Sequence, residues 1–252
     1  MIALLPMYDR PANRAAHDAL WALIRNNLRD TGIAAPKALD RDIDHMKGWA
    51  HPDLVLGQIC NLPFRAKFRG KVTVIGAADY GLAGCPAGHY HSVIVTRHGD
   101  ANRPFSDFAK ARFAANAMIS QSGYGAAQDW ARSHGFTFGA PLITGSHDAS
   151  LQAVATGRAD IAALDAQTWR MQQQDLPAGQ EVSVIAHTTT SPCMTFITKH
   201  GQDYAPYFAA IAAAIGDLSH DHAQILGLTG IHHLPEVDYD MPMPPLPAPI
   251  DA

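Results

Sequence analysis

Short apolar runs alternate with helical repeats along most of the chain. Residues 2–5, 53–58 and 72–77 are apolar runs of strand length. Between the first two runs, apolar side chains recur three or four positions apart, as in a helix that buries one face: Ala16, Leu20, Leu23, Ile24 and Leu28. Further predicted strands cover residues 91–97, 112–116, 161–164, 182–186 and 194–198, and further predicted helices cover residues 63–68, 105–110, 124–134, 147–156, 166–174, 204–218 and 221–226. This order predicts an α/β protein with parallel sheets covered by helices.

Two segments interrupt the alternation and divide the chain into two lobes. Residues 79–89 are rich in glycine and show no periodicity, which is typical of a linker. Residues 187–193 form a second extended crossing between two predicted strands. The predicted parts are a discontinuous outer lobe of residues 1–80 and 190–240, an inserted lobe of residues 91–186, and a tail of residues 241–252.

The tail is rich in proline, with Pro242, Pro244, Pro245, Pro247 and Pro249. Proline lacks a backbone N–H, so this segment cannot be a helix or a central strand and is expected to be an extended polyproline segment. A strap lying across the protein or a disordered end is the favoured expectation, and binding of a partner is the alternative.

Composition excludes several classes of protein. The 252 residues contain 19 Lys and Arg against 23 Asp and Glu, a formal charge of −4, and no basic stripe interleaved with aromatic residues. Nucleic acid is therefore not an expected partner. The longest apolar stretches, such as residues 209–215, are too short to span a bilayer, so no membrane insertion is expected. The sequence begins without a secretory signal, which predicts a cytoplasmic protein if the chain is complete and a periplasmic one if a leader is missing.

Cysteine and histidine do not indicate a metal or a cofactor. Cys60, Cys85 and Cys193 lack the C-x-x-C spacing of a zinc site and are most simply ordinary small residues. A bridge between Cys60 and Cys85 is the alternative, because both follow neighbouring predicted strands, and it requires an oxidising compartment. The 14 histidines show no three-ligand spacing. We therefore expect no metal site and no cofactor.

The segment Ser120-Gln121-Ser122-Gly123 lies where a predicted strand is followed by a predicted helix. Backbone N–H groups at a helix start carry partial positive charge and bind oxyanions. The two Ser hydroxyls add donors, and Gly123 allows the backbone to approach an anion closely. This segment predicts an oxyanion-binding loop, and an ordinary Ser N-cap is the alternative.

Three segments of the middle portion resemble a known family. They are Ser120-Gln121-Ser122-Gly123, then Gly145-Ser146-His147-Asp148-Ala149, then residues 157–165 (Gly-Arg-Ala-Asp-Ile-Ala-Ala-Leu-Asp). In this order and spacing they resemble the phosphonate-binding branch of the ABC-transporter solute-binding proteins. The resemblance is strongest over residues 110–170. It implies the type II periplasmic binding fold, in which two α/β lobes with mixed sheets are joined by two crossings and close on an anion.

The resemblance also implies roles for individual residues. Ser120, Gln121 and Ser122 would hold the oxygens of the anion, with Gln121 in place of a commoner Thr. His147 would reach the same anion, and capping of the helix that it opens is the alternative. Asp165 would face the amine of an aminoalkyl ligand, and an N-cap of the helix at residues 166–174 is an equally physical use of it.

The outer lobe departs from the family pattern. The family places an aromatic-Gly-Pro turn after the strand that corresponds to residues 53–58, where this chain has Gln-Ile-Cys-Asn-Leu-Pro, and Asn61 of this segment is expected to line the cleft. Tyr8, in the turn after the first strand, is also at a position to line the cleft. The second crossing lacks the carboxylate that helps to bind an amine. The anion end of the pocket is therefore expected to be retained and the other end altered.

These observations predict a binding protein without enzymatic activity. Its expected ligand is a small oxyanion (phosphonate, phosphite or phosphate ester), captured for ABC-type uptake or for sensing, with an ABC permease as partner and a monomeric state. Closure of the lobes on the ligand would complete its hydrogen bonds. The alternative is an enzyme on the same fold, acting on a pyrimidine or menaquinone precursor in cofactor biosynthesis, because fold resemblance alone does not separate the two.

Overall fold

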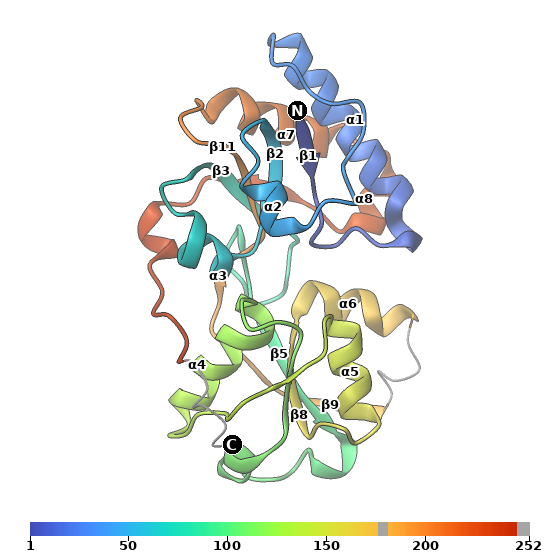
Figure 1. The fold of residues 1–252 in the computed structure, drawn as a ribbon. Helices are drawn as coiled ribbons and strands as arrows, with labels where there is room; N and C mark the ends of the chain where they lie inside the picture. Colours follow the sequence, from blue (N-terminus) through green and yellow to red (C-terminus); the bar gives the residue numbers. More distant parts are fainter. Residues whose placement is uncertain (176–180, 246–252) are drawn as a thin grey trace. The chain divides into compact units, whose positions relative to one another are not determined.

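The computed structural model describes residues 1–175 and 181–245. These residues form two compact units (Figure 1). The first unit comprises Met1–His89 and Pro192–Asp240, and the second comprises Tyr90–Ser191 together with the described part of the tail from Met241. The chain therefore passes from one unit to the other three times, after His89, Ser191 and Asp240.

A five-stranded mixed sheet forms the centre of the first unit, in the order β1-β2-β11-β3-β12. Its strands are β1 (Ile2–Leu4), β2 (Leu54–Ile59), β3 (Val72–Asp79), β11 (Thr195–Lys199) and β12 (Gly230–His232). β1 runs parallel to β2, and β11 runs antiparallel to both of its neighbours, β2 and β3. The carboxyl ends of β1, β2 and β3 therefore lie at the same edge of this sheet.

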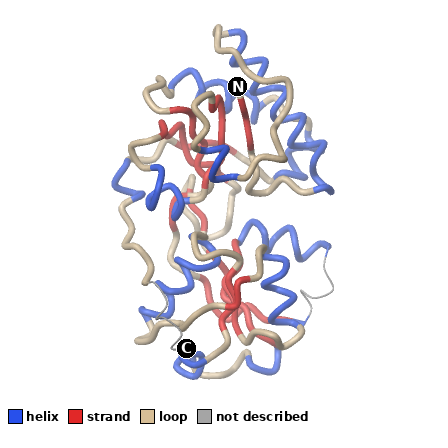
Figure 2. The backbone as a smooth tube through the Cα atoms, viewed as in Figure 1, coloured by secondary structure: helices blue, strands red, loops and turns tan. Residues whose placement is uncertain are grey.

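Helices flank the sheet of the first unit (Figure 2). They are α1 (Arg14–Asp30), α2 (His45–Trp49), α3 (Asn61–Pro63) with the wide turn Phe64–Phe68 that continues it, α7 (Ala205–Gly216) and α8 (His220–Leu226). α1 packs against α7 and α8. Of the five residues predicted to share the buried face of α1, Ala16, Leu20, Ile24 and Leu28 are buried, and Leu23 is only partly buried. The helix ends at Asp30, and Gly32, which follows the cap residue Thr31, has a positive φ of 82° that glycine adopts without strain.

The second unit contains another five-stranded mixed sheet, in the order β7-β6-β8-β5-β9. Its strands are β5 (Ser92–Arg97), β6 (Phe113–Ala115), β7 (Leu142–Ile143), β8 (Ile161–Asp165) and β9 (Val182–His187). β6 runs parallel to β7 and β8, and β5 runs antiparallel to β8 and β9. The helices are α4 (Ala126–Ser133), α5 (His147–Ala155) and α6 (Ala166–Asp175). The segments at the first two passages, β4 (His89–Tyr90) and β10 (Ser191–Pro192), form a two-stranded sheet.

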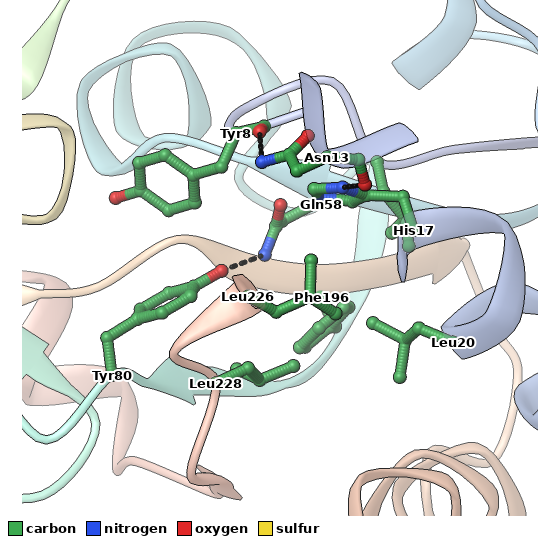
Figure 3. A pocket seen from close by; sticks show the side chains of 10 residues that line it. Tyr8, Asn13, His17, Leu20, Gln58, Tyr80, Phe196, Leu226 and Leu228 are labelled. Atoms are coloured by element: carbon green, nitrogen blue, oxygen red, sulfur yellow. Dashed lines mark hydrogen bonds between the residues drawn. The ribbon is translucent and has the colours of Figure 1, made fainter. Parts of the chain in front are cut away.

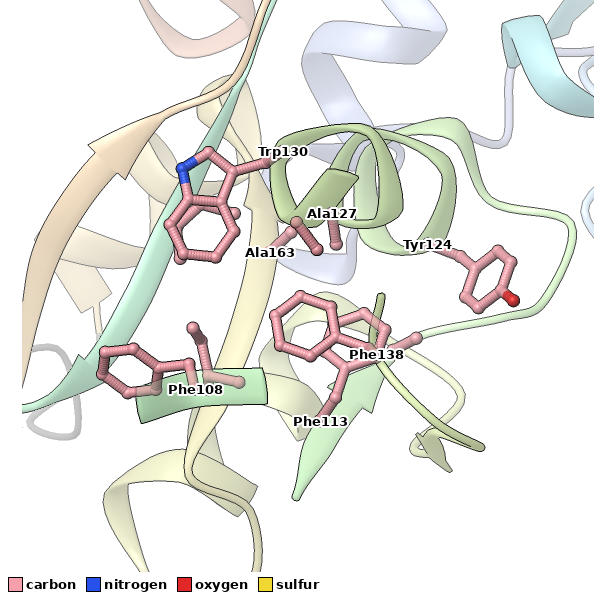
Figure 4. Packing of buried hydrophobic residues seen from close by; sticks show 11 residues of the cluster. Phe108, Phe113, Tyr124, Ala127, Trp130, Phe138 and Ala163 are labelled. Atoms are coloured by element: carbon pink, nitrogen blue, oxygen red, sulfur yellow. The ribbon is translucent and has the colours of Figure 1, made fainter. Parts of the chain in front are cut away.

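Aromatic side chains form much of the core of the second unit (Figure 4). The rings of Phe113 and Phe138 stack with their centroids 4.5 Å apart, and Trp130 stacks on Phe138 at 6.2 Å. Phe113 belongs to β6 and Trp130 to α4, so this cluster holds the helix against the sheet. The connection between β6 and α4 is thereby fixed at both ends.

The structure differs from the sequence predictions in the shortest elements. α2 and β12 were not predicted, because five and three residues are too few to show a period. The predicted helix at residues 105–110 is a tighter 3₁₀ helix, Phe105–Lys110. Short 3₁₀ segments also occur at Pro11–Asn13, His98–Asp100 and Glu236–Tyr239. Cys60 and Cys85 are thiols and are not joined by a disulfide.

Asp160 connects two strands of the second unit and is expected to make stability depend on pH. Its carboxylate accepts hydrogen bonds from the backbone N–H and the guanidinium of Arg112 and from Arg97. The hydrogen bond from the Arg112 side chain is the largest of the effects that hold the pKa of Asp160 well below its usual range. A carboxyl group with a lowered folded-state pKa stabilises the fold above its unfolded-state pKa of about 4, and this contribution is lost as the pH falls below that value.

We therefore expect Asp160→Asn to have a lower free energy of unfolding at pH 7 than the parent protein. We also expect its free energy of unfolding to decrease less than that of the parent as the pH is lowered. Urea unfolding at a series of pH values between 7 and 3 measures both effects. Asp107→Asn, at an exposed carboxylate outside this network, is the matched control. Equal acid dependence in the Asp160 variant and the parent protein would contradict the assignment.

Candidate functional site

The predicted oxyanion loop follows β6 at the carboxyl edge of the second unit's sheet. From β6 the chain continues outward to β7 and then returns across β6 to β8, so the strand order reverses at β6. Ligands of open α/β sheets bind outside the carboxyl ends of strands at such a reversal. Three segments lie at this edge: residues 116–120, which lead from β6 into the predicted loop, the segment after β7, and the end of β8.

Ser120, the first residue of the predicted loop, is the N-cap of a helical turn. Its hydroxyl accepts a hydrogen bond from the N–H of Gly123 at 3.0 Å, and its carbonyl accepts from the N–H groups of Tyr124 and Gly125. These bonds form a wide first turn, Gln121–Gly125, that continues into α4. The N–H groups of Gln121 and Ser122 precede the first helical hydrogen bonds and give the helix start its partial positive charge. The Ser N-cap is thus present in the structure, and oxyanion binding by the same turn stays a prediction.

His147 lies beside this turn, although it is distant in the sequence. Its Nε2 is 3.0 Å from the hydroxyl of Ser122, which is in turn 3.4 Å from the hydroxyl of Ser120. His147 is the first residue of α5, but the cap of α5 is Ser146, whose hydroxyl accepts from the N–H of Ala149. Capping therefore does not account for His147. The structure brings together three of the predicted anion contacts: two hydroxyls and an imidazole.

Gly123 is the most constrained position of the loop. A Cβ at this residue would lie 1.9 Å from Oδ1 of Asn116 and 3.3 Å from Cε1 of His147. Asn116 directly follows β6, and its Oδ1 is buried without a hydrogen-bond partner among the residues that the structure describes. A side chain at residue 123 would therefore require the Asn116 side chain to move and His147 to give way by a few tenths of an ångström.

Three further residues act on the loop and were missed by sequence reasoning. They are Asn116, Ser92 and Thr188. The hydroxyl of Ser92 donates to the carbonyl of Ser122 at 3.0 Å, and the N–H of Ser92 donates to the hydroxyl of Thr188 at 2.9 Å. The position of Asn116 between strand and loop was a usable signal. Ser92 begins β5 and Thr188 directly follows β9, and nothing local in the sequence connects either residue to the loop.

Gln121 and Asp165 are at the same edge but differ in role from the serines. Gln121 is buried, and its side-chain oxygen folds back to within 3.1 Å of the position that a Cβ of Gly125 would occupy. Asp165 is the last residue of β8. Its carboxylate accepts a hydrogen bond from the N–H of Thr168 and thereby caps the start of α6. The N-cap reading of Asp165 is thereby confirmed, and its contact with a ligand stays a prediction.

Tyr8 and Asn61, the predicted contacts of the outer lobe, lie at the carboxyl edge of the first unit's sheet. The Tyr8 ring packs edge to face on Tyr80, with centroids 4.9 Å apart, and Tyr80 accepts from the side chain of Gln58 at 3.3 Å (Figure 3). Asn61 is fully buried and accepts from Arg65. Both residues stay predicted ligand contacts.

A small cavity lies beside Tyr8 in the first unit (Figure 3). Its volume of about 10 Å³ leaves room for a single water molecule. Its lining includes Tyr8, Asn13, His17, Gln58 and Tyr80. The carbonyl of Tyr8 accepts a hydrogen bond from the side chain of Asn13 at 2.9 Å. Because Asn13 directly precedes α1, this bond fixes the turn after β1 to the start of that helix. This cavity is far too small for a phosphonate.

The described residues offer hydrogen-bond donors rather than metal ligands at the loop. Within residues 1–175 and 181–245, no group of three or more His, Cys, Asp or Glu is placed to hold a metal ion. In the same ranges, no helix combines the length and apolar character needed to cross a membrane. The loop can therefore offer hydroxyl, backbone N–H and imidazole groups to an anion.

Two α/β units, each with polar side chains at the carboxyl edge of a mixed sheet, define a periplasmic binding protein of type II. The model of the family described as "ABC transporter, phosphonate, periplasmic substrate-binding protein" matches residues 59–241. The chain belongs to this family, whose members are binding proteins of transporters. It is thus a solute-binding protein of the ABC type, and the enzyme alternative is not favoured.

Solved structures agree with this assignment of the fold. XAC2383 from Xanthomonas citri, bound to chloride, is 15% identical with a TM-score of 0.71, over 94% of this chain and 92% of that one. PhnD1 from Prochlorococcus marinus, in complex with methylphosphonate, is 16% identical with a TM-score of 0.69, over 95% and 94%. A binding protein component of a phosphonate transporter from Pseudomonas aeruginosa is 13% identical with a TM-score of 0.64, over 92% and 80%. A search of curated proteins finds no match to this sequence.

Proposed function

We propose that this protein captures a small tetrahedral oxyanion of the phosphonate or phosphite type and delivers it to an ABC permease. The observation that carries the proposal is the cluster of Ser120, Ser122 and His147 at the start of a helix, with Ser122 Oγ 3.0 Å from His147 Nε2. The ligand is bound and released unchanged, without a chemical step.

The donors at the loop match the chemistry of such an anion. Each hydroxyl donates one hydrogen bond, and an imidazole donates one when neutral and two when protonated. Hydrogen bonds to a charged acceptor are shorter and stronger than neutral ones. Ser120 and Ser122 are largely buried, with 8% and 2% of their surfaces exposed, so bonds to a ligand there would be little screened by solvent. The methylphosphonate in the Prochlorococcus PhnD1 structure supports this ligand class.

A ligand panel tests the proposal. We expect methylphosphonate or phosphite to bind in isothermal titration calorimetry and to stabilise the protein by about 2.7 kcal/mol at 100 times the Kd. Methanesulfonate and pyrimidine phosphates complete the panel, and sodium chloride at equal ionic strength is the control. A phosphonate that has been bound and then released should give the ³¹P NMR spectrum of the intact compound. Absence of binding to every phosphorus oxyanion would refute the proposed ligand class, and a new ³¹P resonance would indicate an enzyme.

A further inference from the structure

The proline-rich tail contacts the helix start that carries the oxyanion loop. Before the tail, Tyr239 is buried in the first unit, where its hydroxyl is 3.2 Å from that of Thr195 and its ring packs on Phe64. From Met241 the chain belongs to the second unit. There, the carbonyl of Pro245 accepts a hydrogen bond from the hydroxyl of Tyr124. The described part of the tail, residues 241–245, thus belongs to the second unit, although more than a hundred residues separate Tyr124 from Pro245.

Tyr124 is a residue of the loop's own first turn. It directly follows Gly123, its N–H donates to the carbonyl of Ser120 at 3.1 Å, and its side chain is 1% exposed. Burial raises the pKa of Tyr124, so the hydroxyl stays protonated and remains a donor. A buried hydroxyl without an acceptor is unfavourable, and the Pro245 carbonyl supplies one.

The composition of the tail suits this contact. Pro242, Pro244 and Pro245 have no N–H and a restricted φ, which favours an extended segment whose carbonyls are not used by a helix or a sheet ladder. Such a segment loses little conformational entropy when it binds. It can therefore present a carbonyl to Tyr124 at low cost.

We propose that the tail is a positioning element of the oxyanion loop, acting through the bond between Tyr124 and Pro245. Tyr124 takes part in both the first turn and the tail contact, so the tail stabilises the turn conformation in which Ser122 faces His147. An anion at the loop stabilises the same conformation. Tail anchorage and ligand binding then strengthen each other, because coupling between two binding events is reciprocal. The part concerning ligand affinity rests on the proposed function.

A double-mutant cycle tests this coupling. Tyr124→Phe retains the ring and removes the hydroxyl, a chain ending at Asp240 removes the tail, and the third protein carries both changes. Tyr207→Phe, at a buried tyrosine of the first unit, is the control. In the absence of ligand, we expect faster hydrogen exchange at the amides of residues 121–125 in either single variant, and no further increase in the double variant.

The affinity for methylphosphonate, or for the panel member that binds best, is the second measurement. It should weaken about three- to tenfold in either single variant, the range of a neutral hydrogen bond, and no further in the double variant. The midpoint of urea unfolding should change little in Tyr124→Phe. Unchanged exchange at residues 121–125, unchanged affinity, or additive effects of the two changes would overturn the proposal. If no phosphorus oxyanion binds to the parent protein, the proposed function fails and the exchange measurement alone decides whether the tail positions the loop.

Discussion

Gly123→Ala is expected to weaken oxyanion binding by about 100-fold. The added Cβ would lie 1.9 Å from Asn116 Oδ1 and 3.3 Å from His147 Cε1, so either the Asn116 side chain or the turn that carries Ser122 must shift. Forced overpacking of this kind costs about 1–3 kcal/mol. This strain disfavours the turn conformation that binds the ligand. The apparent Kd then equals the intrinsic Kd divided by the fraction of molecules in that conformation. Calorimetry with methylphosphonate measures the change.

Two variants separate this steric effect from general damage. Gly139→Ala is the control, because a Cβ there meets no atom within 4 Å and the backbone is not in the left-handed region. Asn116→Ala combined with Gly123→Ala removes the closest clashing atom and should recover part of the affinity. Full affinity in Gly123→Ala, or no recovery in the combined variant despite a native fold, would count against the proposed geometry.

Ser122→Ala is expected to cost about 1.5–3 kcal/mol of binding free energy, a decrease in affinity of about 10- to 150-fold. This is the range for a hydrogen bond to a charged group. The Ser122 hydroxyl is within hydrogen-bond distance of Ser120 and His147, two residues of the same site, so its removal should leave the fold intact.

Calorimetry gives the affinity of this variant, and urea unfolding tests its fold. Ser106→Ala, at an exposed hydroxyl of the same unit, should change neither quantity. Parent-like affinity of Ser122→Ala would remove the hydroxyl from the set of ligand contacts. A large loss of stability would instead show that the serine is mainly structural.

The sequence alone determined the class of fold and indicated the segment that we propose as the centre of the site. Helix α1 shows its buried face in the spacing of Ala16, Leu20, Ile24 and Leu28, because burial of one helical face imposes a period on neighbouring residues. The Ser-Gln-Ser-Gly segment was recognisable for a similar reason. A strand, a cap and a glycine within a few residues define a local geometry, and the Ser120 cap has that geometry in the structure.

Tertiary structure decided which distant residues support that segment. The hydroxyl of Ser92 donates to the carbonyl of Ser122, and the Pro245 carbonyl accepts from the hydroxyl of Tyr124. The first contact joins β5 to the helix start and the second joins the tail to it, and neither leaves a periodic trace in the residues between its partners. Only the register of the folded sheet and the path of the returning chain bring such side chains within hydrogen-bond distance. The sequence therefore indicated the turn that we propose to bind an anion, and the tertiary structure decided what holds this turn in place.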